Sequence, residues 1–242
     1  MLTISALGFG GGVLYMILAY VMNRKQQREQ TAFAVLNTPG YNIGTFALPF
    51  TSSFLGPVGV ITTSLFDVGN SFICLGGAFG VARAMKEGGK VDVKRVLMAP
   101  LSSIPFLTHL MMVTLNLNGW KLPSPVVELA GIIGNANAFL AMLMIGVGFR
   151  LSGEKSQLGS ILRILSVRYG LAVVLALGFW FLLPFDLEVR QTLVILAFAP
   201  IGSAVPVFTA ELKGDVGLSS AINSISIVIS IVIIVTLLVV ML

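Results

Sequence analysis

AVLNTPGYNIGTFALPF, residues 34–50, and LAFAPIGSAVPVF, residues 196–208, are the two stretches from which the architecture can be predicted. Both are apolar enough to lie in a membrane, yet each carries two prolines, which are Pro39 and Pro49 in the first and Pro200 and Pro206 in the second. Proline lacks a backbone N–H donor and clashes with the preceding turn, so each stretch predicts a helix interrupted near its middle. In a bilayer, the freed backbone groups are tolerated only inside protein or beside a water-filled cavity.

The composition of the whole chain indicates a membrane protein. Of its 242 residues, 56% are apolar and 10% are charged, and the mean hydropathy is +0.97. A soluble domain carries about 25% charged residues, so a soluble globular fold is excluded, and the apolar excess also excludes disorder. The single cysteine, Cys74, excludes a disulfide scaffold. The chain is therefore predicted to be an all-α, polytopic membrane protein.

Eight segments are long and apolar enough to span a bilayer as helices: 2–22, 31–50, 57–82, 97–117, 125–149, 160–183, 187–209 and 216–242. The net charge is +5, and 12 of the 15 basic residues fall in alternate gaps between these spans, at 24, 25, 28, 83, 86, 90, 94, 95, 150, 155, 163 and 213. This positive-inside pattern predicts that these gaps are cytoplasmic and that both termini lie outside, in the plasma membrane. It gives no reason to expect nucleic-acid binding.

The two proline-containing spans belong to a repeated pattern. Residues 43–50 parallel residues 201–208 with one gap, and each is followed by a Val-Gly pair, at 58–59 and 216–217. Spans 2 and 3 thus correspond to spans 7 and 8, an offset of five spans. Because five is odd, the second copy crosses the membrane in the opposite orientation to the first. Inverted repeats with broken helices indicate the substrate site of a secondary transporter. The alternative is that glycine and proline are common in membrane helices generally.

With eight spans and an offset of five between the copies, the chain is predicted to form one transmembrane domain, 1–242, with three helices in the first repeat and five in the second. Residues 1–82 form the partial first repeat, 83–96 a cytoplasmic linker, and 97–242 the second repeat. A complete first repeat would have two more helices before Met1.

Five motifs in this order resemble the auxin efflux carrier family: NTPGYNIGTFALPF (37–50), LFDVGNSF (65–72), GNANAFLAMLMIGVGF (134–149), VRYG (167–170) and APIGSAVPVFTAEL (199–212). The resemblance implies ten helices in two inverted repeats, and transport of small organic anions such as mono- or dicarboxylates where the two broken helices cross. It also implies homodimers as candidate assemblies, and the family's first two helices have no counterpart here. Two alternatives stay open: a sodium-coupled carrier like the bile acid:sodium symporters, and a truncated, non-transporting membrane subunit.

Several side chains are expected to contact the substrate. Asn37, Pro39 and Asn42 flank the break in span 2. Ser203 and Pro206 flank the break in span 7, and the hydroxyls of Ser203 and Thr209 are expected to be weaker substrate ligands than the Asn amides. The two Asn amides could instead cap the half-helix ends. The resemblance implies that Asn135 and Asn137, in the middle of span 5, lie beside the crossing and contact substrate or ion, with interhelical hydrogen bonding as the alternative. Asn223 in span 8 has the same two interpretations, with the structural one favoured.

Asp67 lies near the middle of span 3, where a carboxylate is costly and indicates function. With Asn70 it is expected to couple transport to a proton or a sodium ion, and the structural alternative is a hydrogen bond to Asn70 or to the broken helix. Arg168 is expected to extend to the cytoplasmic surface rather than to bind substrate. Cys74 is expected to be buried and inert. No protease or phosphate-loop motif is present, and one histidine, His109, cannot form a metal site, so neither an enzyme nor a cofactor is expected.

Overall fold

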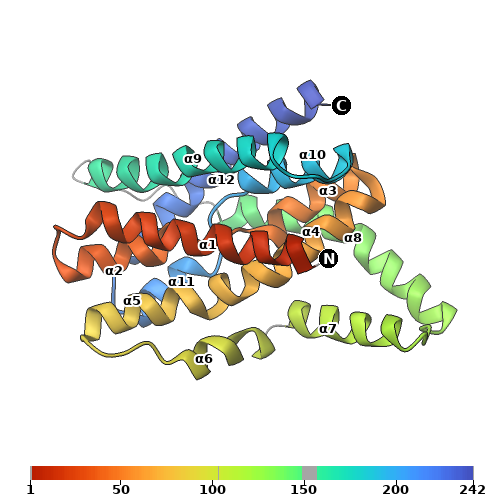
Figure 1. Ribbon diagram of the computed structural model, residues 1–242, viewed down its shortest axis with the longest axis horizontal. Helices are drawn as coiled ribbons and strands as arrows, with labels where there is room; N and C mark the ends of the chain where they lie inside the picture. Colours follow the sequence, from red (N-terminus) through yellow and green to blue (C-terminus); the bar gives the residue numbers. More distant parts are fainter. Residues whose placement is uncertain (1, 103, 149–156, 242) are drawn as a thin grey trace.

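The computed structural model describes residues 2–102, 104–148 and 157–241, and all regular structure within these ranges is helical (Figure 1). This confirms the predicted all-α class. In chain order, the elements are α1 (Leu2–Asn23), α2 (Arg28–Asn37), η1 (Ile43–Ala47), α3 (Leu48–Phe54), α4 (Gly56–Phe72), η2 (Ile73–Gly77), α5 (Ala78–Glu87), α6 (Val93–Met98), η3 (Ala99–Ser102), α7 (Ile104–Leu117), α8 (Ser124–Gly148), α9 (Leu158–Phe181), α10 (Leu187–Ala197), α11 (Val205–Glu211) and α12 (Val216–Met241). Here η1 and η2 are π-helical turns, and η3 is a 3₁₀ turn.

Four helical stretches in the described ranges are long and apolar enough to cross a bilayer: Leu2–Asn23, Gly56–Glu87, Leu158–Phe181 and Val216–Met241. They correspond to predicted spans 1, 3, 6 and 8. Predicted spans 2 and 7 are each divided into shorter helices, and span 4 is divided among α6, η3 and α7. The chain is thus a helical protein with several apolar helices suited to a membrane, and the total of eight spans stays a prediction.

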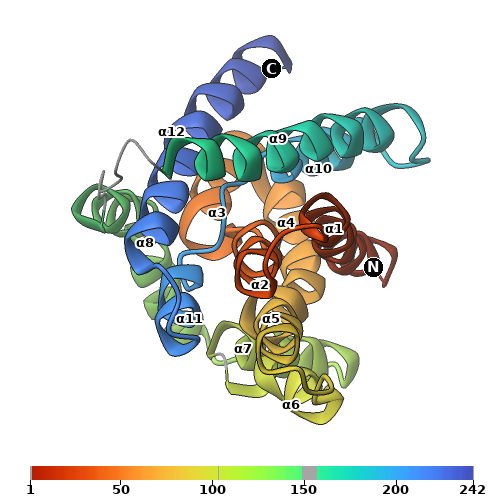
Figure 2. The same cartoon turned by 90° about the vertical axis from the view of Figure 1, so that its left-hand side faces the viewer.

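Helices α1 and α4 approach each other closely because glycine lies at their contact. A Cβ atom added at Gly8 would overlap the carbonyl oxygen of Phe66, and one added at Gly69 would overlap that of Ser5. Small residues of this kind let the backbones of membrane helices come together without a strong hydrophobic driving force. Figure 2 looks along the bundle and shows α2 at the centre, with α1, α5 and α11 around it.

The helix is interrupted in both proline-containing stretches, as the prolines predict. The first interruption, residues 38–42, separates α2 from η1 and α3, and the second, residues 198–204, separates α10 from α11. Pro206 lies in the first turn of α11, where a missing N–H leaves no helical bond unmade. Pro49 is the second residue of α3, which follows η1 directly, so its missing N–H falls where this π-helical turn joins α3. The interruptions run in opposite directions, since α2 and α11 lie toward one end of the bundle and α3 and α10 toward the other (Figure 1).

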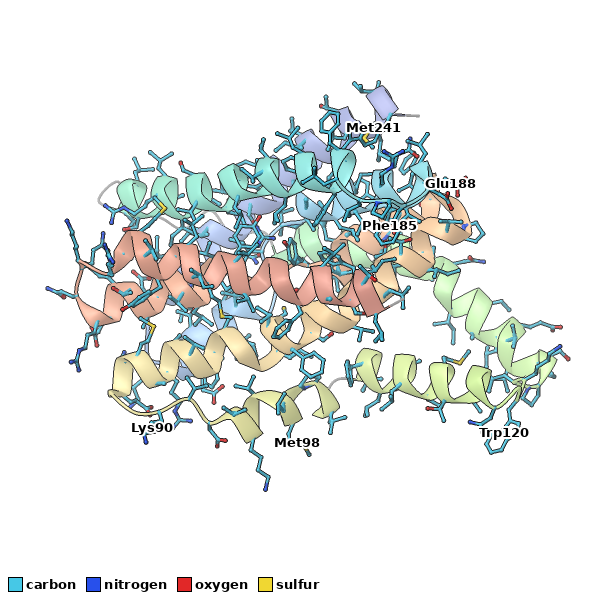
Figure 3. All side chains as sticks on the ribbon, in the orientation of Figure 1. Lys90, Met98, Trp120, Phe185, Glu188 and Met241 are labelled. Carbon is cyan, nitrogen blue, oxygen red and sulfur yellow. The ribbon has the colours of Figure 1, made fainter. Side chains whose placement is uncertain are left out.

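Most of the described basic residues gather at one end of the bundle, which we call the basic end. The α1–α2 turn, the end of α5, the start of α9 and the α11–α12 turn all lie there, whereas both described ends of the chain lie toward the opposite end (Figure 1). Figure 3 shows the same separation, with Lys90 at the basic end and Phe185, Glu188 and Met241 far from it. The described basic residues of the predicted group thus share one end of the bundle, whereas Arg150 and Lys155 lie outside the described residues.

Candidate functional site

The two interruptions lie against each other in the interior of the bundle. The backbone N–H of Asn42 donates a 2.9 Å hydrogen bond to the carbonyl oxygen of Pro200. The Cys74 thiol lies beside both segments, because a Cβ atom at Gly40 would be 3.5 Å from its Sγ and one at Gly202 would be 2.7 Å away. Gly40 also has a φ of +80°, which favours glycine. Cys74 is half-buried rather than fully buried, and it lies at the crossing, which its place in the sequence does not reveal.

Arg168, on α9, joins the two interruptions. Its side chain is fully buried and donates hydrogen bonds to Thr38 O at 3.0 Å and to Ala199 O at 2.7 Å. These carbonyls follow the last turns of α2 and α10, where the helix dipoles place partial negative charge. The rings of Tyr15 and Tyr41 cover the guanidinium, with their centroids 4.4 and 4.5 Å from its Cζ. A positive charge therefore lies at the crossing.

The prediction that Arg168 extends to the cytoplasmic surface is wrong. It lies ten residues along α9, about 15 Å from the helix start at 1.5 Å per residue, so its side chain would have to run far along the helix to reach water. The carbonyls left free by the two interruptions and the two aromatic faces satisfy the charge inside the protein instead. In the part of the chain that the structure describes, only its Nε lacks a hydrogen-bond partner among the guanidinium nitrogens.

Each interruption is also held by an asparagine from the long helix that follows it. Asn70 on α4 accepts from Tyr41 N at 2.9 Å and donates to Tyr41 O at 2.9 Å. Asn223 on α12 donates to Ile201 O at 3.0 Å and to Gly202 O at 3.1 Å, which supports its structural interpretation. Nearby, Ser226 Oγ accepts from Ile201 N at 3.2 Å. These side chains replace backbone hydrogen bonds that a continuous helix would have made.

Asn37 does not face the crossing but joins α2 to α11 and α12. Its Nδ2 donates to Thr209 Oγ1 at 3.3 Å, and its Oδ1 accepts from Ser219 Oγ at 2.6 Å. The same Nδ2 donates to Phe33 O at 3.0 Å, and only 1% of the residue is exposed. Both ends of the amide are thus occupied by the protein. The structure gives Asn37 a structural role, and substrate contact by this side chain stays a prediction.

On one side of the crossing, Gly44 is exposed and Thr45 beside it is half-buried. Ser203, in the second interruption, is exposed as well. Asn42 is buried, and its Oδ1 accepts a hydrogen bond from Thr45. Gly44 and Thr45 belong to the first turn of η1, where backbone N–H groups have no helical partner and carry partial positive charge. A small anion could therefore be held at this side of the crossing.

The other predicted site residues divide into two groups. Pro39 is buried and Pro206 is half-buried at the crossing, and Asp67 on α4 is half-buried, with its Oδ1 accepting from Asn70 Nδ2 at 2.9 Å. Asp67 is thus tied through Asn70 to the first interruption, which is the structural alternative given above. By contrast, Asn135 is exposed on α8, although α8 packs against η1 and α3.

Asn137 lies on α8, but its side chain is outside the described residues. Within the described ranges, no group of three or more His, Cys, Asp or Glu side chains could hold a metal ion.

Sequence reasoning missed the cluster of Arg168, Tyr15 and Tyr41. The one signal for it was the position of Arg168, which lies too far inside an apolar span for its side chain to reach water easily. A charge at such a position needs a buried partner. The partners themselves come from α1 and from the first interruption, and no local pattern links them to α9. Neither protein-family models nor curated proteins give a match to this sequence.

Proposed function

We propose that this chain is a secondary transporter of small organic anions, moving mono- or dicarboxylates by alternating access at the crossing of its two interruptions. One observation carries the proposal: the interruptions are hydrogen-bonded to each other through Asn42 N and Pro200 O, and the buried Arg168 binds carbonyls of both. Broken helices that meet inside a membrane protein are the usual place for a transporter's substrate.

The proposed site holds the anion with neutral donors close to one buried cation. The carboxylate lies beside Gly44, where the side-chain amide of Asn42 and the first turn of η1 supply N–H groups. Arg168 is occupied by carbonyls and rings, so it contributes a favourable electrostatic potential without binding the substrate directly. Such an arrangement attracts an anion and still allows it to leave.

The proposal includes membership of the auxin efflux carrier family, with eight spans arranged as an incomplete inverted repeat. Two features support this: the interruptions run in opposite directions through the bundle (Figure 1), and each is held by an asparagine, Asn70 or Asn223, of the following helix. The basic end would face the cytoplasm, with both termini outside. A cysteine in place of Lys90 should then react only from the cytoplasmic side, and one in place of Lys121 only from outside.

A sodium-coupled carrier, like the bile acid:sodium symporters, is the second candidate. It is favoured by the oxygen-rich environment of Asp67, whose carboxylate lies next to the Asn70 amide and the Tyr41 carbonyl that this amide binds. Carboxylate and carbonyl oxygens are the ligands that hard cations prefer. The two candidates differ in the coupling ion, a proton or sodium, and both place the anion at the crossing.

The direct test is uptake of radiolabelled malonate into proteoliposomes that contain the purified chain. We expect uptake that unlabelled carboxylates inhibit and that Asn42→Ala reduces, while Ser52→Ala, an exposed position on the neighbouring α3, leaves it unchanged. Replacing sodium by choline, or removing the pH gradient, identifies the coupling ion. Absence of carboxylate-specific uptake by folded protein would favour the non-transporting subunit and overturn the proposal.

A further inference from the structure

A separate pocket opens at the basic end of the bundle, away from the crossing. It has a volume of about 430 Å³, and its walls come from α2, the start of α9, the end of α5 and the α11–α12 turn. This volume lies in the range of roughly 300–1,000 Å³ that small-molecule sites occupy. No residue of the two interruptions, 38–42 and 198–204, lines it. An occupant of this pocket would therefore be distinct from a substrate at the crossing.

The pocket lining includes apolar side chains and a buried, neutral polar residue. Phe33 and Leu36 on α2 and Ile164 on α9 supply the apolar lining. Thr209 also lines the pocket, is 1% exposed, and already hydrogen-bonds to Asn37 and Ser219. A purely inorganic ion would leave the apolar lining without a partner, whereas an organic ligand would cover it.

The charged lining residues leave an excess of positive charge. Glu29 is paired with Lys86 at 3.4 Å, and the Lys86 ammonium also donates to Leu212 O at 2.9 Å. Asp215 accepts from Leu218 N at 2.9 Å and from Gln157 Nε2 at 2.8 Å.

The remaining two lining charges, Arg163 and Lys213, are both cations and are exposed. Neither has an ion-pair partner among the residues that the structure describes. The helices α2 and α9 both begin at this pocket, and their first turns add partial positive charge. The lining carries three cations, Lys86, Arg163 and Lys213, against two carboxylates, Glu29 and Asp215, so its net charge is positive and favours an anionic ligand.

We propose that this pocket binds a small organic anion, with its carboxylate between Arg163 and Lys213 and its apolar body against Phe33, Leu36 and Ile164. The bound anion would contact both α2 and α11, next to the Asn37–Thr209–Ser219 hydrogen bonds that join these helices. The site depends on the pocket and its charges alone, so it does not require that the chain transports anything.

The test is protection of a thiol placed in the pocket wall. In the full chain carrying Cys74→Ala, Ser160→Cys lines the pocket and is exposed, and its reaction with N-ethylmaleimide is timed with and without benzoate. We expect benzoate to slow the reaction several-fold, and its neutral isostere benzamide and inorganic phosphate to have little effect. A cysteine at Lys90, exposed at the same end but outside the pocket, should react at the same rate in all cases.

The cation pair is tested by a matched pair of double variants. Arg163→Gln with Lys213→Gln should raise the benzoate concentration needed for half protection roughly three- to tenfold, because it removes two partly solvated charged contacts. Lys90→Gln with Lys94→Gln removes the same charge from the same end outside the pocket and should leave that concentration unchanged.

Three results would overturn the proposal: equal protection by benzamide, equal protection by phosphate, or full protection after loss of both cations. Asn42→Ala separates this site from the crossing, because protection at Ser160→Cys should persist in that variant. If Asn42→Ala abolishes protection, benzoate acts from the crossing and the pocket proposal fails alone. If malonate uptake fails while protection persists, the transport proposal fails alone.

Discussion

The first interruption, residues 38–42, is closed, whereas the second, residues 198–204, is partly open. All five residues of the first are buried, and Asn70 binds both the N–H and the carbonyl of Tyr41. In the second, Ser203 is exposed, and Asn223 binds only carbonyls, while a different side chain, Ser226, accepts from Ile201 N. Similar proline patterns thus lead to two different ways of satisfying the backbone. The first interruption is therefore shielded along its whole length, whereas the second is shielded except at Ser203 and Ala204.

Arg168 is the element common to both interruptions, so its removal should have the largest effect. Replacing it by Leu leaves Thr38 O and Ala199 O without a donor. We expect the free energy of unfolding to fall by about 2–5 kcal/mol, since each buried unsatisfied carbonyl costs about 1–3 kcal/mol. Arg163→Leu on the same helix is the control, and its exposed side chain should change stability by no more than about 0.5 kcal/mol. Equal unfolding midpoints for the two variants in detergent would show that Arg168 does not hold the crossing together.

Replacing Asn70 should lower the free energy of unfolding more than replacing Asn223, because Asn70 satisfies both a donor and an acceptor of the backbone. Asn70→Ala leaves the buried Tyr41 N–H without an acceptor and Asp67 Oδ1 without the Asn70 donor, while Tyr41 O keeps only its bond from Ile43 N. We expect a loss of about 2–3 kcal/mol, because a buried unsatisfied donor costs about 1–3 kcal/mol by itself. Asn223→Ala leaves Ile201 O without its donor, whereas Gly202 O keeps the hydrogen bond from Val205 N, so the loss should be about 1 kcal/mol. Chemical unfolding of both variants measures the difference. A larger effect at Asn223 would reverse the assignment of the closed and open segments.

The two glycines at the crossing should be sensitive to alanine for different reasons. At Gly40 the backbone has a φ of +80°, so alanine should cost about 1–2 kcal/mol whatever its neighbours. At Gly202 the obstacle is the Cys74 Sγ, 2.7 Å from the added Cβ. Adding Cys74→Ala should therefore restore much of the stability of Gly202→Ala but little of that of Gly40→Ala. Thermal unfolding of the two double-mutant cycles checks this, and equal rescue at both positions would contradict it.

The smallest effect on stability is expected for a cysteine substitution at the exposed Ser203 in the second interruption. In a Cys74→Ala background, Ser203→Cys should react readily with a small thiol reagent, because Ser203 is exposed, whereas Asn42→Cys should react slowly at 5% exposure. Mass spectrometry of the labelled, folded protein gives both rates. Faster labelling at position 42 would place the accessible side of the crossing at the first interruption.

Sequence alone could predict those features of the site that depend on local chemistry. Prolines predicted both interruptions because the loss of a backbone donor acts on the nearest turn. The spacing of three between Asp67 and Asn70 places both side chains on one face of a helix, and the hydrogen bond between them was one of the two interpretations. The partners of Asn37 could not be predicted in the same way, since Thr209 lies 172 residues away along the chain.

Hydropathy, proline and charge act over short segments, so they were enough to predict an all-α chain with apolar helices and two helices interrupted at prolines. They did not predict the division of span 4 into α6, η3 and α7. The position of the Arg168 side chain depends on the packing of the helices. Its hydrogen-bond acceptor Thr38 O is 130 residues distant, and it becomes a partner only when α2, α9 and α10 pack together. A buried cation is stable where free carbonyls converge on it, and that convergence is a property of packed helices rather than of any one segment.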